Sequence, residues 1–163
     1  MYPMRLHKRE IHDMKEMQEI LEECKVVRIG SCDEHGMFIV PMNFGYVFSE
    51  EERKLKLYVH SACEGRKAEA FKKNVQVAFE MDCTHALIQG AYTCSYSYAY
   101  RSIMGNGTIH RIEENKEKIY GLKLLMEHLA PEAEIQFKEE MLHRVAVYRI
   151  DVTEFTGKKR EPK

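Results

Sequence analysis

The chain has 163 residues, of which 44% are hydrophobic, and its 25 lysines and arginines nearly balance 26 aspartates and glutamates. A chain of this size and composition can bury roughly 70% of its unfolded surface, which excludes a disordered tail protein and a disulfide-stapled miniprotein. The formal net charge of −1 gives no long-range attraction for polyanions, so we expect no nucleic-acid partner. We predict one domain that spans residues 1–163.

The cysteines and the N-terminus indicate the compartment. The number of cysteines, five, is odd, and their spacings suit neither a disulfide framework nor paired zinc knuckles, so we expect reduced thiols and no metal site. The charged N-terminus lacks the apolar segment of a signal peptide. No apolar stretch approaches the roughly 20 residues that cross a bilayer. We therefore expect a cytoplasmic protein with no membrane partner.

The first half of the chain predicts a helix followed by strands. Asp13 and Glu16 have capping-box spacing, and apolar residues then recur at helical intervals, which predicts a helix over about 14–24. β-Forming residues on both sides of the turn at 33–36 predict a hairpin. Pro41 removes one backbone donor from the second strand, which we expect to be an edge or to bulge. Two more strands are expected over 43–48 and 55–60.

The second half adds a short helix, long strands and a longer helix. We expect a helix over 66–74, a strand over 75–81, and a connection over 83–97 that is too long for a plain hairpin. A long strand over 98–112 should bulge at Gly105-Asn106-Gly107, because these residues adopt positive φ at low cost. The remaining predicted elements are a helix over 114–129 with an apolar face, a helical turn over 139–142, a strand over 145–152 and a basic tail over 157–163.

The predicted order of elements favours a mainly β fold. Strands follow one another and are mostly joined by short turns, which argues against a parallel doubly wound sheet. We therefore predict about six strands in an antiparallel barrel or sandwich, with the helices packed outside.

One segment has the composition of an anion site. A helix that begins at Arg66 would direct free backbone N–H groups at the preceding loop. Ser61 adds a hydroxyl, and Arg66 and Lys67 add two cations, of which arginine can hold phosphate with two parallel hydrogen bonds. These residues suit a monophosphate, although taken alone they fit a solvated surface better.

Two further segments suggest contacts to a flat ring system. Asn43 lies beside the strand interruption at Pro41, where free backbone groups could pair with a heterocycle or could simply be solvated. The tyrosines between Cys94 and Ser102 alternate as in a strand, so they could stack on a ring or pack at a dimer interface.

Together these segments resemble a known family. The sequences VPMNFGY, LYVHSACEGRKAEAFKKN, VAFEMD and CSYSYAYRSIMGNGTI occur in this order. They resemble the pyridoxamine 5'-phosphate oxidase-like FMN-binding split barrels, most closely the nitroimidazole-resistance (Nim) branch. The resemblance implies a six-stranded antiparallel split barrel that forms a homodimer, with FMN sites between the subunits.

The resemblance also assigns residues. It implies that Ser61, Arg66 and Lys67 hold the FMN phosphate. The residues implied to line the flavin are Val40, Pro41, Met42 and Asn43, continued by Tyr58, Val59 and His60 along the same wall. The residues implied to close the site from the partner chain are Tyr100, Arg101 and Ser102.

The expected function is an FMN-dependent oxidoreductase that passes electrons to a small acceptor such as a nitro-aromatic compound. His60 is the leading candidate for a catalytic contact with the substrate. The alternative is a non-catalytic module that binds flavin or haem, with His60 as an axial haem ligand. The substrate-phosphate pattern of the full oxidase is not found, so we do not expect pyridoxal-phosphate synthesis.

Overall fold

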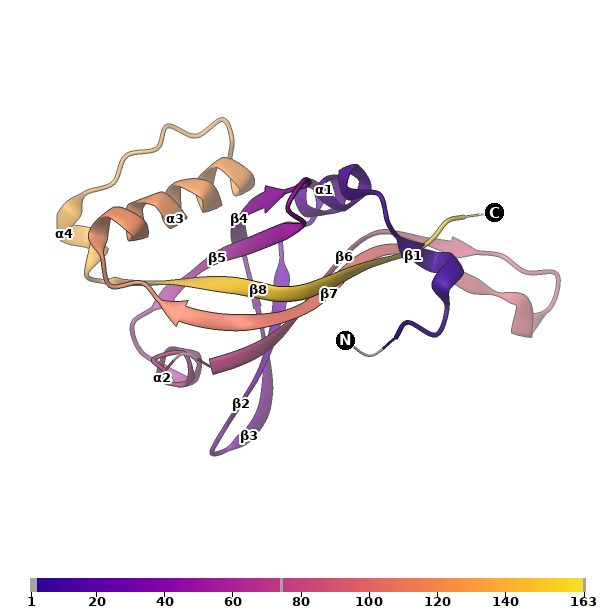
Figure 1. Cartoon of the computed structure of the whole chain (residues 1–163), viewed down its shortest axis with the longest axis horizontal. Coiled ribbons are helices and arrows are strands. Elements are labelled where there is room, and N and C mark those ends of the chain that lie inside the picture. The colour runs from indigo at the N-terminus through magenta and orange to yellow at the C-terminus, as the bar shows by residue number, and fades with distance from the viewer. Residues whose placement is uncertain (1–2, 74, 163) are drawn as a thin grey trace.

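The computed structural model describes residues 3–73 and 75–162, in which one antiparallel sheet of eight strands curls around a core and helices pack outside (Figure 1). The sheet order is β3-β2-β6-β7-β8-β5-β4, and β1 pairs with β8. The elements, in chain order, are η1 (His7–Arg9), β1 (Glu10–Ile11), α1 (Met14–Glu23), β2 (Val27–Asp33), β3 (Gly36–Met42), β4 (Phe44–Ser49), β5 (Lys54–Ala62), α2 (Arg66–Ala70), β6 (Val75–Ile88), η2 (Thr93–Ser95), β7 (Ser97–Arg111), α3 (Asn115–Leu129), α4 (Glu139–Leu142) and β8 (Val145–Arg160).

The mainly β, antiparallel architecture with peripheral helices confirms the predicted fold class. The described residues form eight strands rather than six. One additional strand, β1, has two residues and pairs Glu10 with Lys158, so it is too short to show any periodicity in the sequence.

Three predicted helices are confirmed. Asp13 caps α1 by accepting a hydrogen bond from the backbone N–H of Lys15, and α1 ends at Glu23, one residue before the predicted end. α4 has the predicted bounds. α3 lies where we expected it, but its buried face is Lys118, Gly121, Leu122 and Leu125, whereas Leu129 is exposed. Lys118 and Gly121 face the sheet because α3 approaches it closely at two glycines, Gly45 of β4 and Gly121 of the helix itself.

The close contact between α3 and the sheet depends on Gly45 and Gly121. A Cβ on Gly45 would lie 2.5 Å from the carbonyl carbon of Leu124, and a Cβ on Gly121 would lie 2.6 Å from the ring of Tyr58. Without side chains at these two positions, α3 covers the outer face of β4 and β5.

β3 is an edge strand, as Pro41 predicted, and pairs with β2 alone. The short helix is shorter than expected: α2 ends at Ala70, and Asn74, its expected last residue, lies outside the described residues. The basic segment from Gly157 to Arg160 is not a tail, because β8 continues through it and pairs with β7.

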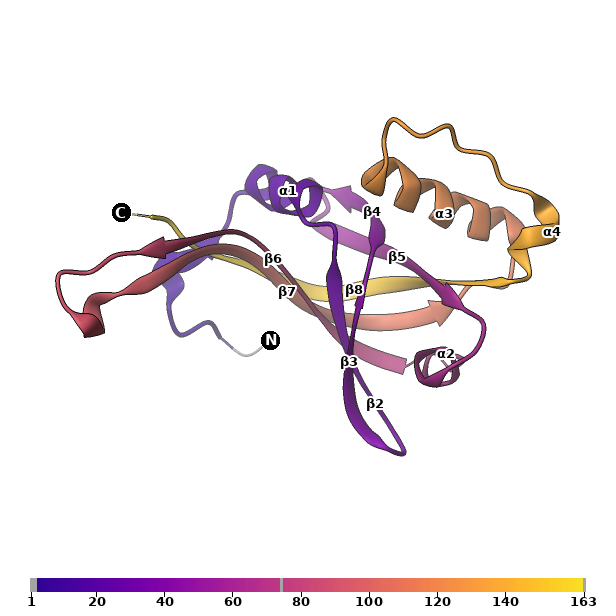
Figure 2. The same ribbon diagram turned by 180° about the vertical axis from the view of Figure 1, so that it is seen from behind.

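The connection expected over 83–97 is also partly strand. β6 continues to Ile88, β7 begins at Ser97, and the two pair as a hairpin arm that projects from the barrel (Figure 2).

The bulge is where it was predicted, between Asn106 and Gly107, but Thr153 of β8 is the extra residue. Positive φ does not explain the bulge, because the described glycines with positive φ are Gly36 and Gly65, and neither lies in β7. At Gly105 a Cβ would lie 2.5 Å from the Glu154 carbonyl oxygen, so close strand approach excludes a side chain.

Candidate functional site

The barrel is open where the edges of β3 and β5 lack a second partner. β5 pairs with β4 only as far as Val59, opposite Phe44, so His60 to Ala62 pair with β8 alone. α2 follows β5 and lies to the side of the β2–β3 hairpin (Figure 2), and it contacts β2. The ring of Phe71 lies 6.2 Å from that of Phe38, and the Arg66 guanidinium lies 4.6 Å above the Phe38 ring. The opening therefore has backbone edges on two sides and a cationic helix beside it.

Arg66, an expected phosphate ligand, is paired within the chain. Its guanidinium donates two hydrogen bonds to Asp33, at 2.7 and 2.8 Å, and one to the Gly36 carbonyl oxygen at 3.0 Å. The hydrogen bonds from Arg66 lower the pKa of Asp33 to about 2. Arg66 thus fastens α2 to the hairpin tip, and its charge is compensated by a neighbouring carboxylate.

Lys67 differs from Arg66, because no carboxylate of the described residues pairs with it. The charge of Lys67 acts on His60, whose side chain is exposed on the outer face of β5. Burial of part of the imidazole and then the positive charge of Lys67 lower the pKa of His60. An ammonium and an imidazole therefore share the end of β5 beside the opening, and both can donate hydrogen bonds to an anion.

The other residues expected on β5 have their side chains occupied. The Ser61 hydroxyl is buried on the opposite side of the strand from His60 and donates to the Ala62 carbonyl oxygen at 2.7 Å. Val59 is fully buried in the core. Tyr58 is buried beneath α3, with its ring edge-on to Tyr120 at 5.7 Å, and burial raises the pKa of its phenol. These three residues offer a ligand their backbone more readily than their side chains.

The β3 segment from Val40 to Asn43 runs along the same opening. Pro41 is exposed on the edge strand, whereas Met42 points into the core. The Asn43 amide donates a hydrogen bond to the Lys25 carbonyl oxygen at 2.8 Å. The structure thus brings this segment to the end of β5, because Asn43 precedes the first β4 residue that pairs with β5.

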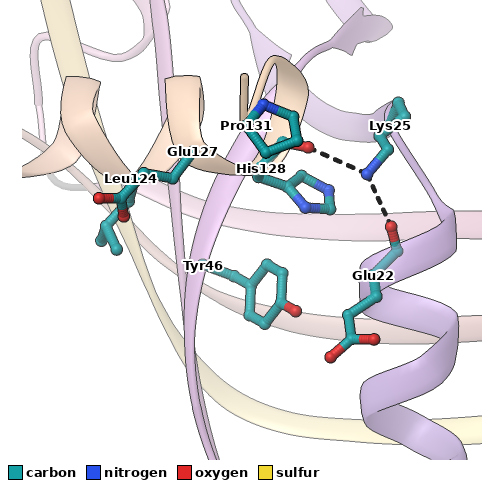
Figure 3. A pocket seen from close by; sticks show the side chains of 7 residues that line it. All are labelled: Glu22, Lys25, Tyr46, Leu124, Glu127, His128 and Pro131. Carbon is teal, nitrogen blue, oxygen red and sulfur yellow. Dashed lines mark hydrogen bonds between the residues drawn. The ribbon is translucent and has the colours of Figure 1, made fainter. Parts of the chain in front are cut away.

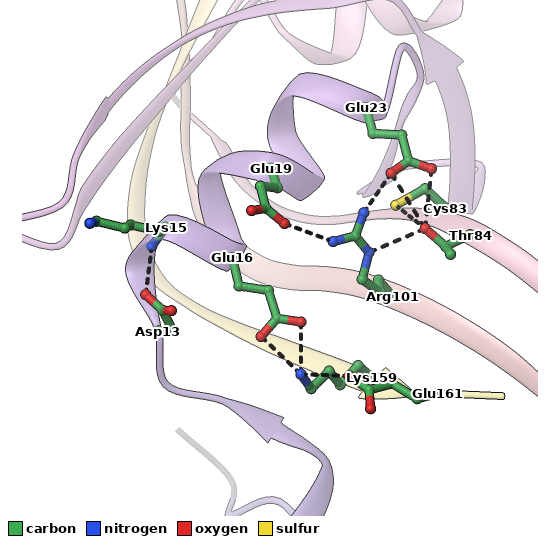
Figure 4. A network of polar contacts seen from close by, with 10 residues as sticks. All are labelled: Asp13, Lys15, Glu16, Glu19, Glu23, Cys83, Thr84, Arg101, Lys159 and Glu161. Carbon is green, nitrogen blue, oxygen red and sulfur yellow. Dashed lines mark hydrogen bonds and ion pairs between the residues drawn. The ribbon is translucent and has the colours of Figure 1, made fainter. Parts of the chain in front are cut away.

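The structure does not bring Tyr100, Arg101 and Ser102 to this site. On β8, Val147 pairs with His60 and Lys158 with Ser102, and an extended strand between these positions spans roughly 35 Å. Arg101 instead donates to Glu19 and Glu23 of α1 and to Thr84 (Figure 4). Within one chain these residues belong to the base of the arm and cannot close the opening.

Sequence reasoning missed a hollow of about 430 Å³ between the ends of α1 and α3 (Figure 3). The Lys25 ammonium donates to the carbonyl oxygens of Glu22 and His128, at 2.7 and 3.0 Å. The His128 ring is 2.7 Å from the Cys24 carbonyl oxygen. Lys25 thus neutralises the negative ends of both helices. No local pattern could reveal this, since the two helices are distant in sequence.

The described residues contain no group of three or more His, Cys, Asp or Glu side chains placed to hold a metal ion. None of the helices in the described ranges is long and apolar enough to cross a membrane.

The fold and site define a class: antiparallel split barrels with an unpaired strand edge and cationic side chains at the opening. The family model described as pyridoxamine 5'-phosphate oxidase matches residues 13–159, and the chain belongs to this family. This confirms the family that the sequence motifs resembled. A search of curated proteins found no match.

Solved structures agree with this assignment. A candidate 5-nitroimidazole antibiotic resistance protein from Bacteroides thetaiotaomicron is 30% identical, with coverage of 92% of this chain and 86% of that chain and a TM-score of 0.78. The flavocytochrome Anf3 from Azotobacter vinelandii is 19% identical, with 98% and 73% coverage and a TM-score of 0.81. An FAD and haem binding protein from Mycobacterium smegmatis is 15% identical, with 95% and 76% coverage and a TM-score of 0.81. The last two similarities concern the fold alone.

Proposed function

We propose that the chain binds FMN at the opening between β3 and β5 and acts as a cytoplasmic FMN-dependent oxidoreductase on a small acceptor such as a nitro-aromatic compound. The observation that carries the proposal is the Lys67 ammonium, which has no carboxylate partner among the described residues and lies beside the exposed His60. The flavin and nitroimidazole-resistance relatives support it.

The donor set fits a phosphate monoester in part. Lys67 is available to the phosphate, whereas Arg66 and Ser61 would first have to exchange their present partners, Asp33 and the Ala62 carbonyl oxygen. Val40, Pro41, Met42 and Asn43 would border the flavin ring through the backbone edge of β3, and Tyr58 and Val59 through the backbone of β5. His60, between the Lys67 ammonium and Asn43, is the proposed catalytic contact with the substrate.

When bound, FMN would supply the electron transfer. The chain's own residues would hold it and would supply the polar contacts around it. The lowered pKa of His60 keeps its imidazole neutral near pH 7, so that it can donate one hydrogen bond and accept another.

We also propose a homodimer in which Tyr100, Arg101 and Ser102 of a second copy close each site. These residues cannot reach the opening of their own chain. An apolar face supports the dimer, because Met37, Ile39 and Met104 are 88%, 71% and 56% exposed on the outer side of the sheet. The face is hollowed between β3 and β6, where Ile39, Gly30 and Ala78 lie side by side in the pairing register.

Titration with FMN and with riboflavin tests the phosphate assignment, because riboflavin lacks the phosphate. We expect Lys67→Met to weaken FMN binding about 10- to 100-fold and to leave riboflavin binding unchanged, since it removes one charge-assisted contact. Lys72→Met, on the same segment but paired with Glu69, is the matched control and should bind FMN as the unchanged protein does. Equal affinity of the Lys67 and Lys72 variants for FMN would refute the assignment.

The reaction is tested by mixing dithionite-reduced, FMN-loaded protein with a 5-nitroimidazole without oxygen. We expect reoxidation of the bound flavin to outpace that of free reduced FMN. His60→Gln should retain FMN and slow the reaction about 100-fold. A rate equal to that of free FMN would support a non-catalytic flavin carrier instead.

Haem binding is the second candidate, favoured by the exposed His60 imidazole, for which the described residues provide no hydrogen-bond partner. It predicts a Soret band on haem titration that His60→Ala abolishes. A Soret band that is the same for the unchanged protein and for His60→Ala would exclude His60 as the axial ligand.

A further inference from the structure

Two cysteines that are distant in sequence meet at the base of the arm. Cys24 directly follows α1, and Cys83 lies in β6 where the pairing register with β7 shifts between Cys83 and Ala86. Both are free thiols buried in the main core, with 4% and 8% of their surface exposed. Both belong to the same core cluster, and the Cys83 thiol lies close enough to Cys24 to raise the pKa of that thiol.

A polar network outside the core holds both cysteines in this arrangement (Figure 4). The Thr84 hydroxyl donates to the Glu23 carboxylate at 3.1 Å and lies 3.5 Å from the Cys83 sulfur. Arg101 bonds to the same carboxylate at 2.6 Å and to the Thr84 hydroxyl at 3.1 Å. The residues next to each cysteine are thus bound to one another, which fixes the chain on both sides of the thiol pair.

The backbone beside the pair is strained. Thr84 has a φ of 58°, in the left-handed region that a β-branched residue rarely adopts. This conformation accommodates the register shift and directs the Thr84 hydroxyl to Glu23. The fold therefore maintains a strained residue at the point where the two thiols meet.

We propose that Cys24 and Cys83 are the site of an intramolecular disulfide that forms when the protein meets a peroxide or a low-molecular-weight disulfide. With hydrogen peroxide, the two thiols lose two electrons and two protons to form one S–S bond, and the peroxide is reduced to two molecules of water. With oxidised glutathione, one thiolate forms a mixed disulfide and releases one glutathione. The second cysteine then displaces the other glutathione.

The environment predicts slow formation and a strong preference for this pair. Burial, and then the neighbouring Cys83, raise the pKa of the Cys24 thiol, so the reactive thiolate is scarce. Cys32 and Cys94 are exposed and should react with glutathione first. Once one buried thiol has reacted, its neighbour competes with solution thiols at a high effective concentration. The bond would join the end of α1 covalently to the base of the arm.

The test equilibrates the full-length protein in glutathione buffers of graded redox ratio, in native buffer and in 8 M urea, followed by peptide mapping without reduction. Folding should favour the Cys24–Cys83 bond. We therefore expect the native protein to be half-oxidised at a glutathione ratio at least about 10-fold more reducing than the ratio that half-oxidises the protein in urea. A variant with Cys32, Cys63 and Cys94 changed to alanine should behave identically. Glutathione on Cys32 and Cys94 with Cys24 and Cys83 still reduced would overturn the proposal, as would equal ratios in both buffers.

A second measurement does not depend on any variant that removes a buried cysteine. Mass spectrometry of the oxidised, unchanged protein should show a loss of two mass units on the linked peptides that contain Cys24 and Cys83. Linkage of either cysteine to a different one would also overturn the assignment. Neither result depends on flavin binding.

Discussion

His60 and Lys67 show how one charge, which no carboxylate of the described residues pairs with, affects the pKa of a neighbouring residue. Burial and the Lys67 charge both disfavour the imidazolium, so the pKa of His60 falls below the ordinary 6.5. The unfolded chain then binds more protons than the folded chain between the two pKa values. The contribution of His60 to stability is therefore fully present above pH 6.5 and is lost as the pH falls through the folded pKa.

An NMR titration of the His60 ring protons tests this effect. We expect a midpoint below 6.5 in the unchanged protein, and a rise toward 6.5 in Lys67→Met that stops short of it, because burial remains. His128 is the control, because burial and Lys25 rather than Lys67 lower its pKa, so its midpoint should not change in the variant. A His60 midpoint that Lys67→Met leaves unmoved would mean that the ammonium is not close to the imidazole in solution.

Arg66 shows the limit of assigning a role from residue type. Its position at the start of a helix predicted an anion ligand, and the structure gives it an anion, the Asp33 carboxylate of its own chain. Asp33 is separated from Arg66 by three strands, so no spacing rule connects them. Lys67, next in the sequence, has no such partner in the described part of the chain and is the better candidate.

Among the elements, those with strong local signals were predicted and those fixed by pairing were not. Asp13 and the apolar periodicity located α1, and Pro41 located an edge strand. The ends of β6 and β8 were missed because each strand continues for as long as its neighbour offers backbone partners. The apolar face predicted for α3 is only part of its buried face, since Gly45 and Gly121 decide how the helix sits on the sheet.

The contact between α3 and β4 gives a prediction at the scale of an element. Gly45→Ala should destabilise the protein by about 1–3 kcal/mol, because its Cβ would clash with helix backbone rather than with a flexible side chain. Gly30→Ala is the control, since the nearest atom to its Cβ would be 3.8 Å away, and it should change stability by less than about 1 kcal/mol. Urea unfolding curves measure both. Equal effects of the two substitutions would show that α3 does not rest on Gly45.

At the scale of the whole molecule, the fold separates the two parts of the expected site: the opening at His60 and the segment from Tyr100 to Ser102. The opening at His60 and the segment from Tyr100 to Ser102 lie at opposite ends of β8. One chain therefore cannot form the complete site that the sequence motifs imply. A second copy, docked on the apolar outer face, is the arrangement that we propose.

Sedimentation tests the dimer. We expect the unchanged protein to sediment as a dimer of the 19.2 kDa chain, and Ile39→Glu to sediment as a monomer, because a buried unpaired carboxylate opposes association. Met141→Glu changes a methionine that is 47% exposed on α4, away from the proposed interface, and should remain dimeric. A monomeric unchanged protein, or a dimeric Ile39 variant, would contradict the proposed interface.

The sequence by itself determined the class of fold, the positions of most elements and the family. These properties follow from caps, turns and periodicities that act between residues close together in the chain. Only the tertiary structure decided which partner Arg66 takes, that Cys24 meets Cys83, and that Tyr100 to Ser102 lie far from His60. Such relations depend on strand register and on how the sheet closes, and these are set by all the strands together.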